Sequence, residues 1–74
     1  MSLQTAQKFL ELMSQSRVMQ SQFRVADPPN LDKLLRFAHG KGFVMTAEDL
    51  DAALKDFPSN GIVNAIRERS KKRK

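Results

Sequence analysis

Prolines and glycines divide this 74-residue chain into short segments. The breakers are Pro28, Pro29, the pair Gly40 and Gly42, and Pro58. Proline lacks an amide hydrogen and disfavours helical geometry in the residue before it, and glycine readily takes the left-handed conformation that ends a helix. Any helices must therefore be short and joined by brief turns.

Between the breakers, apolar residues recur at the three- and four-residue steps that place side chains on one face of a helix. No strand-like alternation appears. The pattern predicts an all-α fold, a small bundle of four to five short helices. The apolar positions of the five segments are Leu3, Ala6, Phe9, Leu10 and Met13; Val18, Met19, Phe23 and Ala26; Leu31, Leu34, Leu35 and Ala38; Leu50, Ala53, Leu54 and Phe57; and Ile62, Val63 and Ile66.

Polar residues that favour helix N-caps precede most of these segments, at Ser2, Asn30, Thr46 and Asn60. The strongest start signal lies at Thr46, because Asp49 stands where a capping box needs an acid. The glycine-flanked stretch "GKGFVMTAEDL" is therefore interpreted as the stop of one helix and the start of the next.

Positive charge is concentrated at one end. Through Ile66 the chain carries seven Lys or Arg residues and seven Asp or Glu residues, so residues 67–74 hold the entire net charge of +5. We predict a helical domain over residues 1–66 and a disordered basic tail over residues 67–74.

Small size limits the stability of the domain. With no Cys and a single His, disulfides and structural metals are not expected to support it, which leaves good helix packing or self-association as a homodimer. The chain has no signal-peptide pattern and no apolar run near the roughly 20 residues that cross a bilayer. We expect a soluble, cytoplasmic protein that does not bind membranes.

Two stretches resemble a phosphate loop and a DNA-binding helix-turn-helix, but neither fits its motif well. "HGKG" is not a phosphate loop, because a helix rather than a strand precedes it and no Ser or Thr follows Lys41 directly. Ala38 and Gly42 have the spacing of a helix-turn-helix elbow, but the helix after them carries four acidic residues and one lysine, and DNA phosphates would repel it. A plain helical hairpin is favoured.

No residue set points to catalysis, a metal or a cofactor. His39 stands at an expected helix end, where capping is favoured over catalysis. The remaining candidate site is the basic tail, which can neutralise the phosphates of a nucleic acid or simply keep the chain soluble; both interpretations stay open. Its cations are Arg67, Arg69, Lys71, Lys72, Arg73 and Lys74.

Taken together, "SLQTAQKFLELM" and "LLRFAHGKGFVMTAEDLDAAL" resemble the small helical proteins first associated with bacterial nitrogen-fixation loci. The second stretch carries that family's Gly-Phe, two-residue, Thr-Ala-Glu signature at Gly42, Phe43, Thr46, Ala47 and Glu48. The same domain also serves as the leader region of ribosomally made, enzymatically modified peptides. The resemblance covers residues 2–54 and implies an all-helical, bacterial, cytoplasmic domain.

The resemblance also bears on whether the domain is part of a precursor peptide or a stand-alone protein. A precursor peptide of this family should carry a core rich in Cys, Ser or Thr, and after Phe57 this chain has only Ser59 and Ser70. We expect a stand-alone member.

Three functions follow as hypotheses. The first is a non-enzymatic interaction module that binds a protein partner through an apolar helix face. The second is a nucleic-acid-associated accessory protein that contacts phosphates through the tail. The third is a leader or precursor of a modified peptide.

Overall fold

A computed structural model describes residues 3–72. The described residues form five helices and no strand: α1 (Leu3–Gln15), α2 (Arg17–Ala26), α3 (Leu31–Gly40), α4 (Ala47–Asp56) and α5 (Gly61–Ser70). This confirms the predicted all-α fold of short helices. The predicted cap Ser2 and the cations Arg73 and Lys74 lie outside the described residues.

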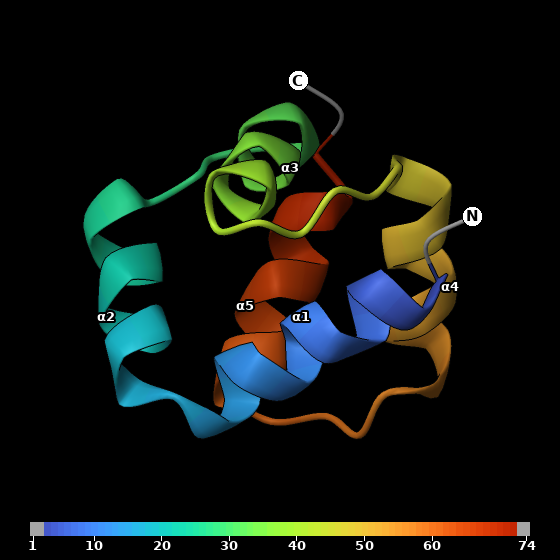
Figure 1. The fold of residues 1–74 in the computed structure, drawn as a ribbon, viewed down its shortest axis with the longest axis horizontal. Coiled ribbons are helices and arrows are strands. Elements are labelled where there is room, and N and C mark those ends of the chain that lie inside the picture. Colours follow the sequence, from blue (N-terminus) through green and yellow to red (C-terminus); the bar gives the residue numbers. More distant parts are fainter. Residues whose placement is uncertain (1–2, 73–74) are drawn as a thin grey trace.

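The helices are arranged around α1 and α5, which lie at the centre of the molecule (Figure 1). Helix α1 packs on α2, α4 and α5, and its contacts with α4 are the most extensive. Helix α5 packs on α1, α3 and α4. Helix α2 lies at the edge and packs mainly on α1.

The core follows the predicted apolar faces in α1, α3, α4 and α5, except that Leu3 at the start of α1 is 44% exposed. Helix α1 contributes Phe9, Leu10 and Met13, all fully buried, and α5 contributes the fully buried Val63 and Ile66. The last pair shows that the segment after Pro58 belongs to the bundle. Burial of side chains this large supplies most of the free energy that holds a small helical domain together.

Aromatic side chains join the helices at the centre. The ring of Phe9 lies 5.5 Å from that of Phe43 and 6.4 Å from that of Phe37, measured between centroids. Phe37 also meets Phe23 edge-on, with 5.8 Å between centroids. Edge-to-face and tilted contacts of this kind add to the stabilisation from burial. They connect α1, α2, α3 and the α3–α4 turn.

Side-chain caps begin the helices as predicted. Asn30, Thr46 and Asn60 each accept a hydrogen bond from the backbone amide three residues further on. At Thr46 the capping box is complete, because Asp49 Oδ2 also accepts a hydrogen bond from the Thr46 amide at 3.2 Å. Ser16, which the sequence did not single out, caps α2 in the same way. The short helices therefore start at defined residues.

The "GKGFVMTAEDL" stretch forms the turn between α3 and α4, which confirms its interpretation as a helix stop and start. Gly42 has a φ of +93°, a conformation that side-chain-bearing residues avoid. The Phe43 amide donates a hydrogen bond of 2.9 Å to the Ala38 carbonyl oxygen, which closes the end of α3.

Helices α3 and α4 do not form the predicted hairpin. Each of them packs on α5 rather than mainly on the other (Figure 1). Helix α5, whose Val63 and Ile66 are fully buried, packs on both of them. The same arrangement departs from a helix-turn-helix, in which the two helices pack closely on each other.

Candidate interaction surfaces

The basic segment departs from its predicted boundary. Helix α5 continues four residues beyond Ile66, to Ser70, so the first half of the predicted tail is helical. The Ser70 side chain is 4% exposed and donates a hydrogen bond of 2.7 Å to the Arg67 carbonyl oxygen. The Leu31 amide donates a hydrogen bond of 2.7 Å to the Lys72 carbonyl oxygen, which fixes the end of α5 against the start of α3.

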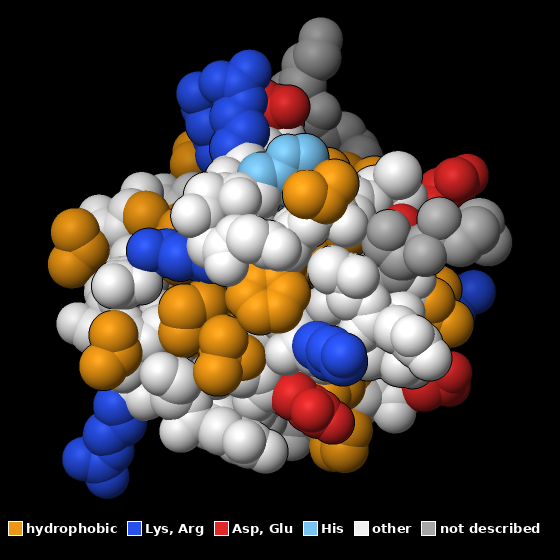
Figure 2. Space-filling view, in the orientation of Figure 1, with side chains coloured by type: hydrophobic (Ala, Val, Ile, Leu, Met, Phe, Trp, Pro, Cys, Tyr) orange, Lys and Arg blue, Asp and Glu red, His pale blue; other side chains and the backbone are white. Residues whose placement is uncertain are grey.

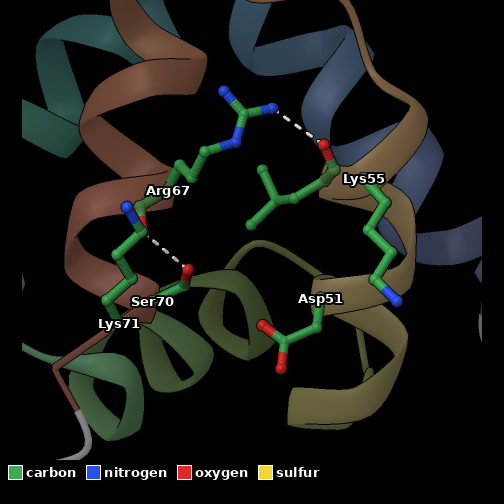
Figure 3. Close-up of a pocket in the computed structure, with 6 residues that line it drawn as sticks. Asp51, Lys55, Arg67, Ser70 and Lys71 are labelled. Atoms are coloured by element: carbon green, nitrogen blue, oxygen red, sulfur yellow. Dashed lines mark hydrogen bonds between the residues drawn. The ribbon is translucent and has the colours of Figure 1, made fainter.

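Arg67 ties α5 to the end of α4. Its Nη2 donates a hydrogen bond of 2.8 Å to the carbonyl oxygen of Leu54, and its Nη1 donates to Asn64 Oδ1 and to Ser59 Oγ at 2.9 and 3.2 Å. Figure 3 shows the guanidinium turned toward the Leu54 carbonyl. The donors of this side chain are largely used within the fold.

Arg69 ties α5 to α2. Its Nη2 lies 3.0 Å from Asp27 Oδ1, and its guanidinium carbon lies 5.0 Å from the centre of the Phe23 ring. Asp27 ends α2 in the left-handed conformation, with a φ of 45°. The arginine therefore stacks on one residue of α2 and pairs with the residue that ends it.

The structure divides the six predicted site cations into three groups. Arg67 and Arg69 hold helices together. Lys71 and Lys72 are exposed just beyond α5, and Lys71 Nζ lies 3.7 Å from Glu68 Oε2. Arg73 and Lys74 lie outside the described residues. The four described cations thus do not form one continuous row of free charge.

A hollow of about 330 Å³ opens between α4 and α5. Figure 3 shows Asp51 and Lys55 on the α4 side and Arg67 and Lys71 on the α5 side. The carboxylate of Asp51 lies within this group of cations, so the hollow is of mixed charge rather than uniformly basic. Because Arg67 is hydrogen-bonded to the Leu54 carbonyl oxygen, the exposed cations of the hollow are Lys55 and Lys71.

A second surface is apolar and lies on α2 and α3. Val18 and Val25 on α2 are 65% and 85% exposed, although Met19 and Phe23 on the same helix are buried. The sequence prediction that Val18 and Ala26 share the buried face was therefore wrong. In Figure 2, hydrophobic side chains gather on the side of the molecule where α2 lies.

A hollow of about 380 Å³ adjoins this stripe, between α2 and the end of α3. Phe37 is half-buried there, and Lys41 Nζ lies 5.5 Å from the centre of its ring. The name α2–α3 face is used below for Val18, Ser21, Gln22, Val25, Ala26, Phe37 and Lys41. The sequence signal for this surface is the seven-residue spacing of Val18 and Val25, which forms a stripe separate from that of Met19 and Phe23.

Other kinds of site find little support among residues 3–72. In that range no three His, Cys, Asp or Glu side chains gather as metal ligands would. His39 lies in the last turn of α3, and its Nε2 is 3.3 Å from the carbonyl oxygen of Met45. None of the helices described combines the length and the apolar character needed to cross a membrane.

Comparison with known proteins gives one match. The family model described as the Nif11 domain matches residues 1–50. Neither a curated protein nor a solved structure matches the chain significantly. The matched range contains α1, α2, α3 and the start of α4, and it ends before α5.

Proposed function

Because this chain belongs to the Nif11 family, whose domain covers residues 1–50, we propose that it is a non-enzymatic helical module that binds a protein partner through an exposed apolar helix face. The family is associated with nitrogen-fixation loci and supplies leader regions of modified peptides. In a leader region the helical domain is bound by another protein, which carries out the chemistry. In the same way, the α2–α3 face binds a partner protein, and any chemistry belongs to that partner.

The observation that carries this proposal is the outward apolar stripe of α2. The helix already buries Met19 and Phe23 against the bundle, so Val18 and Val25 are not needed for its packing. Single exposed apolar side chains are common on protein surfaces. Here two of them share one helix face, and Val25 lines a hollow together with Phe37; grouped apolar surface of this kind marks interaction sites.

The nucleic-acid alternative is less favoured by the geometry. Arg67 and Arg69 direct their guanidinium groups at Leu54, Asp27 and Phe23 within the fold. Phosphate contacts would therefore depend on fewer cations than the sequence offers. The salt dependence of binding would be correspondingly shallow, because each neutralised phosphate adds about 0.9 to the slope on B-DNA.

The precursor alternative is also less favoured. Modification at Ser70 would require an enzyme to reach a side chain that is 4% exposed and hydrogen-bonded to Arg67. Ser59 is exposed, but its hydroxyl accepts a hydrogen bond from the same arginine. Both serines take part in the α4–α5 contact rather than in a separate core segment.

In-cell photocrosslinking tests the proposal. A photoreactive amino acid is placed at Val25, and in a matched variant at Val44, which is 66% exposed and does not line the hollow. We expect a discrete protein adduct from position 25 that resists nuclease and is absent from position 44. Adducts from both positions alike, or from neither, would contradict a specific apolar face.

A companion variant tests the tail without damaging the fold. Replacing Lys71 and Lys72 with glutamine removes exposed charge, whereas ending the chain at Ile66 would cut α5 in half. The proposal predicts that the glutamine variant keeps the protein adduct. If the adduct is lost and nucleic acid leaves the captured material with it, the accessory-protein alternative replaces the proposal.

A further inference from the structure

The α2–α3 face combines an open hollow with exposed apolar side chains. Its hollow of about 380 Å³ is lined by Phe37 on α3 and by Val25 and Ala26 on α2. Val25 projects at the edge with 85% of its surface exposed. A hollow of this kind accepts a large apolar side chain from a facing helix, as in recognition of a helix in a groove.

The rim of this face is cationic. Arg17 and Arg24 each precede one of the exposed valines, so they lie along the same flank of α2, seven residues apart. Neither lines the hollow of the α2–α3 face itself, and Arg24 lines a separate hollow next to Gln20 and Asn60. Lys41 stands on the opposite side, over the Phe37 ring. Helix α2 contains no acidic residue, and none lines the hollow. The nearest acid in the chain, Asp27, is paired with Arg69 at 3.0 Å.

A second copy of the chain does not suit this rim. If two α2 helices packed through their valine stripes in parallel about a two-fold axis, the arginine flank of each copy would face the Lys41 side of the other. In an antiparallel pair, Arg17 of each copy would face Arg24 of the other. Both pairings bring like charges together across the contact, which is a cost that disfavours association.

A lipid bilayer suits the charge of the rim but not its shape. An anionic membrane would attract the two arginines. The apolar part of the face, however, is an open hollow beside two exposed valines, without the large aromatic anchors that lie in a bilayer interface. A protein helix supplies the protruding side chain that the hollow lacks.

We infer that the α2–α3 face binds an amphipathic helix with an acidic flank, placing one large apolar side chain over Phe37 and carboxylates opposite Arg17, Arg24 and Lys41. The inference rests on the proposed function and specifies its partner. Val18 and Val25 lie about 10 Å apart along α2, since a helix rises about 1.5 Å per residue, so a partner helix of about three turns spans the face.

Selection from a peptide library tests this inference. The displayed peptides share a helical apolar stripe, and their flanking positions vary among Glu, Gln and Lys. The full chain serves as bait, and binders to the Val25→Glu variant are removed. We expect Glu to be enriched at the flanks. Enrichment of Lys, or no enrichment of any flank, would overturn the inference.

Affinity measurements on one enriched peptide give the matched comparison. Val25→Glu should weaken binding by about tenfold or more, and Val44→Glu, at a valine that is 66% exposed and lies outside the face, should leave it unchanged. Arg24→Glu should weaken binding too, and exchanging Glu for Lys in the peptide should restore it. Equal effects at positions 25 and 44 would refute the assigned surface.

Two further arms separate the competing occupants. Sedimentation with vesicles of phosphatidylcholine and phosphatidylserine in equal parts should leave the protein in solution. Analytical ultracentrifugation should show no association that Val25→Glu abolishes. Binding to vesicles or self-association through this face would each overturn the acidic helix as its occupant.

The library and the crosslinking experiment can fail separately. If position 25 captures a cellular protein but the library enriches no acidic helix, the interaction module stands and the partner chemistry is wrong. If acidic helices bind in the library but position 25 captures nothing in cells, the face has the inferred chemistry and the proposed function fails. Urea unfolding of Val25→Glu confirms that the fold is intact in either case.

Discussion

Replacing Arg69 with alanine tests whether the last turn of α5 belongs to the fold. The side chain makes an ion pair with Asp27 at 3.0 Å and stacks on Phe23 at 5.0 Å. Because Asp27 is 72% exposed, the ion pair is worth only about 0.2–1 kcal/mol. The arginine is 28% exposed, and its contact with the aromatic ring is worth about 0.5–2 kcal/mol.

The two contacts together predict a loss of about 0.7–3 kcal/mol in the free energy of unfolding. A domain of this size has about 4–11 kcal/mol in total, so the loss is readily measured. With a urea dependence of about 1 kcal/mol per molar, the unfolding midpoint should fall by about 0.7–3 M.

Two further variants sharpen the test. Arg36→Ala is the control, because Arg36 also pairs with an acid, Asp32 at 3.5 Å, but both partners are largely exposed on one helix. It should cost only about 0.3–0.5 kcal/mol. Asp27→Asn removes the charge while tolerating the left-handed backbone, and a double-mutant cycle with Arg69→Ala isolates the ion pair. An Arg69→Ala midpoint equal to that of Arg36→Ala would refute the structural role of Arg69.

Three other changes test the turns and the core, each read by urea unfolding monitored by circular dichroism. Gly42→Ala should lower the free energy of unfolding by about 1–2 kcal/mol, because its φ of +93° is strained for alanine, whereas Gly40→Ala at the end of α3 should raise it or leave it unchanged; equal effects would contradict the assigned turn. Thr46→Ala should cost about 0.5–2 kcal/mol and Thr46→Ser much less, and an equal loss in both would argue against the hydroxyl as the cap. Ile66→Ala should cost about 2–5 kcal/mol, since the side chain is fully buried, and a loss below about 1 kcal/mol would mean that α5 is not part of the core.

Local signals made much of the fold predictable. Asn30, Thr46 and Asn60 begin helices because their side chains bond to amides three residues away, an interaction that needs no distant partner. The breakers act over similarly short distances. The spacing of apolar residues then predicted the buried faces of α1 and α5, whose stripes are single and unambiguous.

The orientation of α2 could not be predicted in the same way. This helix carries two apolar stripes, one with Met19 and Phe23 and one with Val18 and Val25. Periodicity alone does not choose between them, because the choice depends on which stripe meets Phe37 and the rest of the core. The candidate site was missed for this reason.

The helical structure of the last residues of α5 was not predicted, because most of these residues are charged. A run of arginines and lysines ordinarily indicates a solvated segment. Here Arg69 pairs with Asp27, which is 42 residues away in the chain, and the Lys72 carbonyl oxygen accepts a hydrogen bond from the amide of Leu31. Contacts between residues so far apart leave no pattern in the local sequence, so composition placed the boundary four residues too early.

The position of α1 has a consequence for synthesis of the protein. Phe9, Leu10 and Met13 leave the ribosome first, yet the helices that cover them, α4 and α5, are translated last. Until Val63 and Ile66 emerge, the nascent chain exposes an apolar helix to chaperones and to its neighbours on the same messenger RNA. Folding of this domain can therefore be completed only after α5 has been translated, rather than helix by helix as the chain is made.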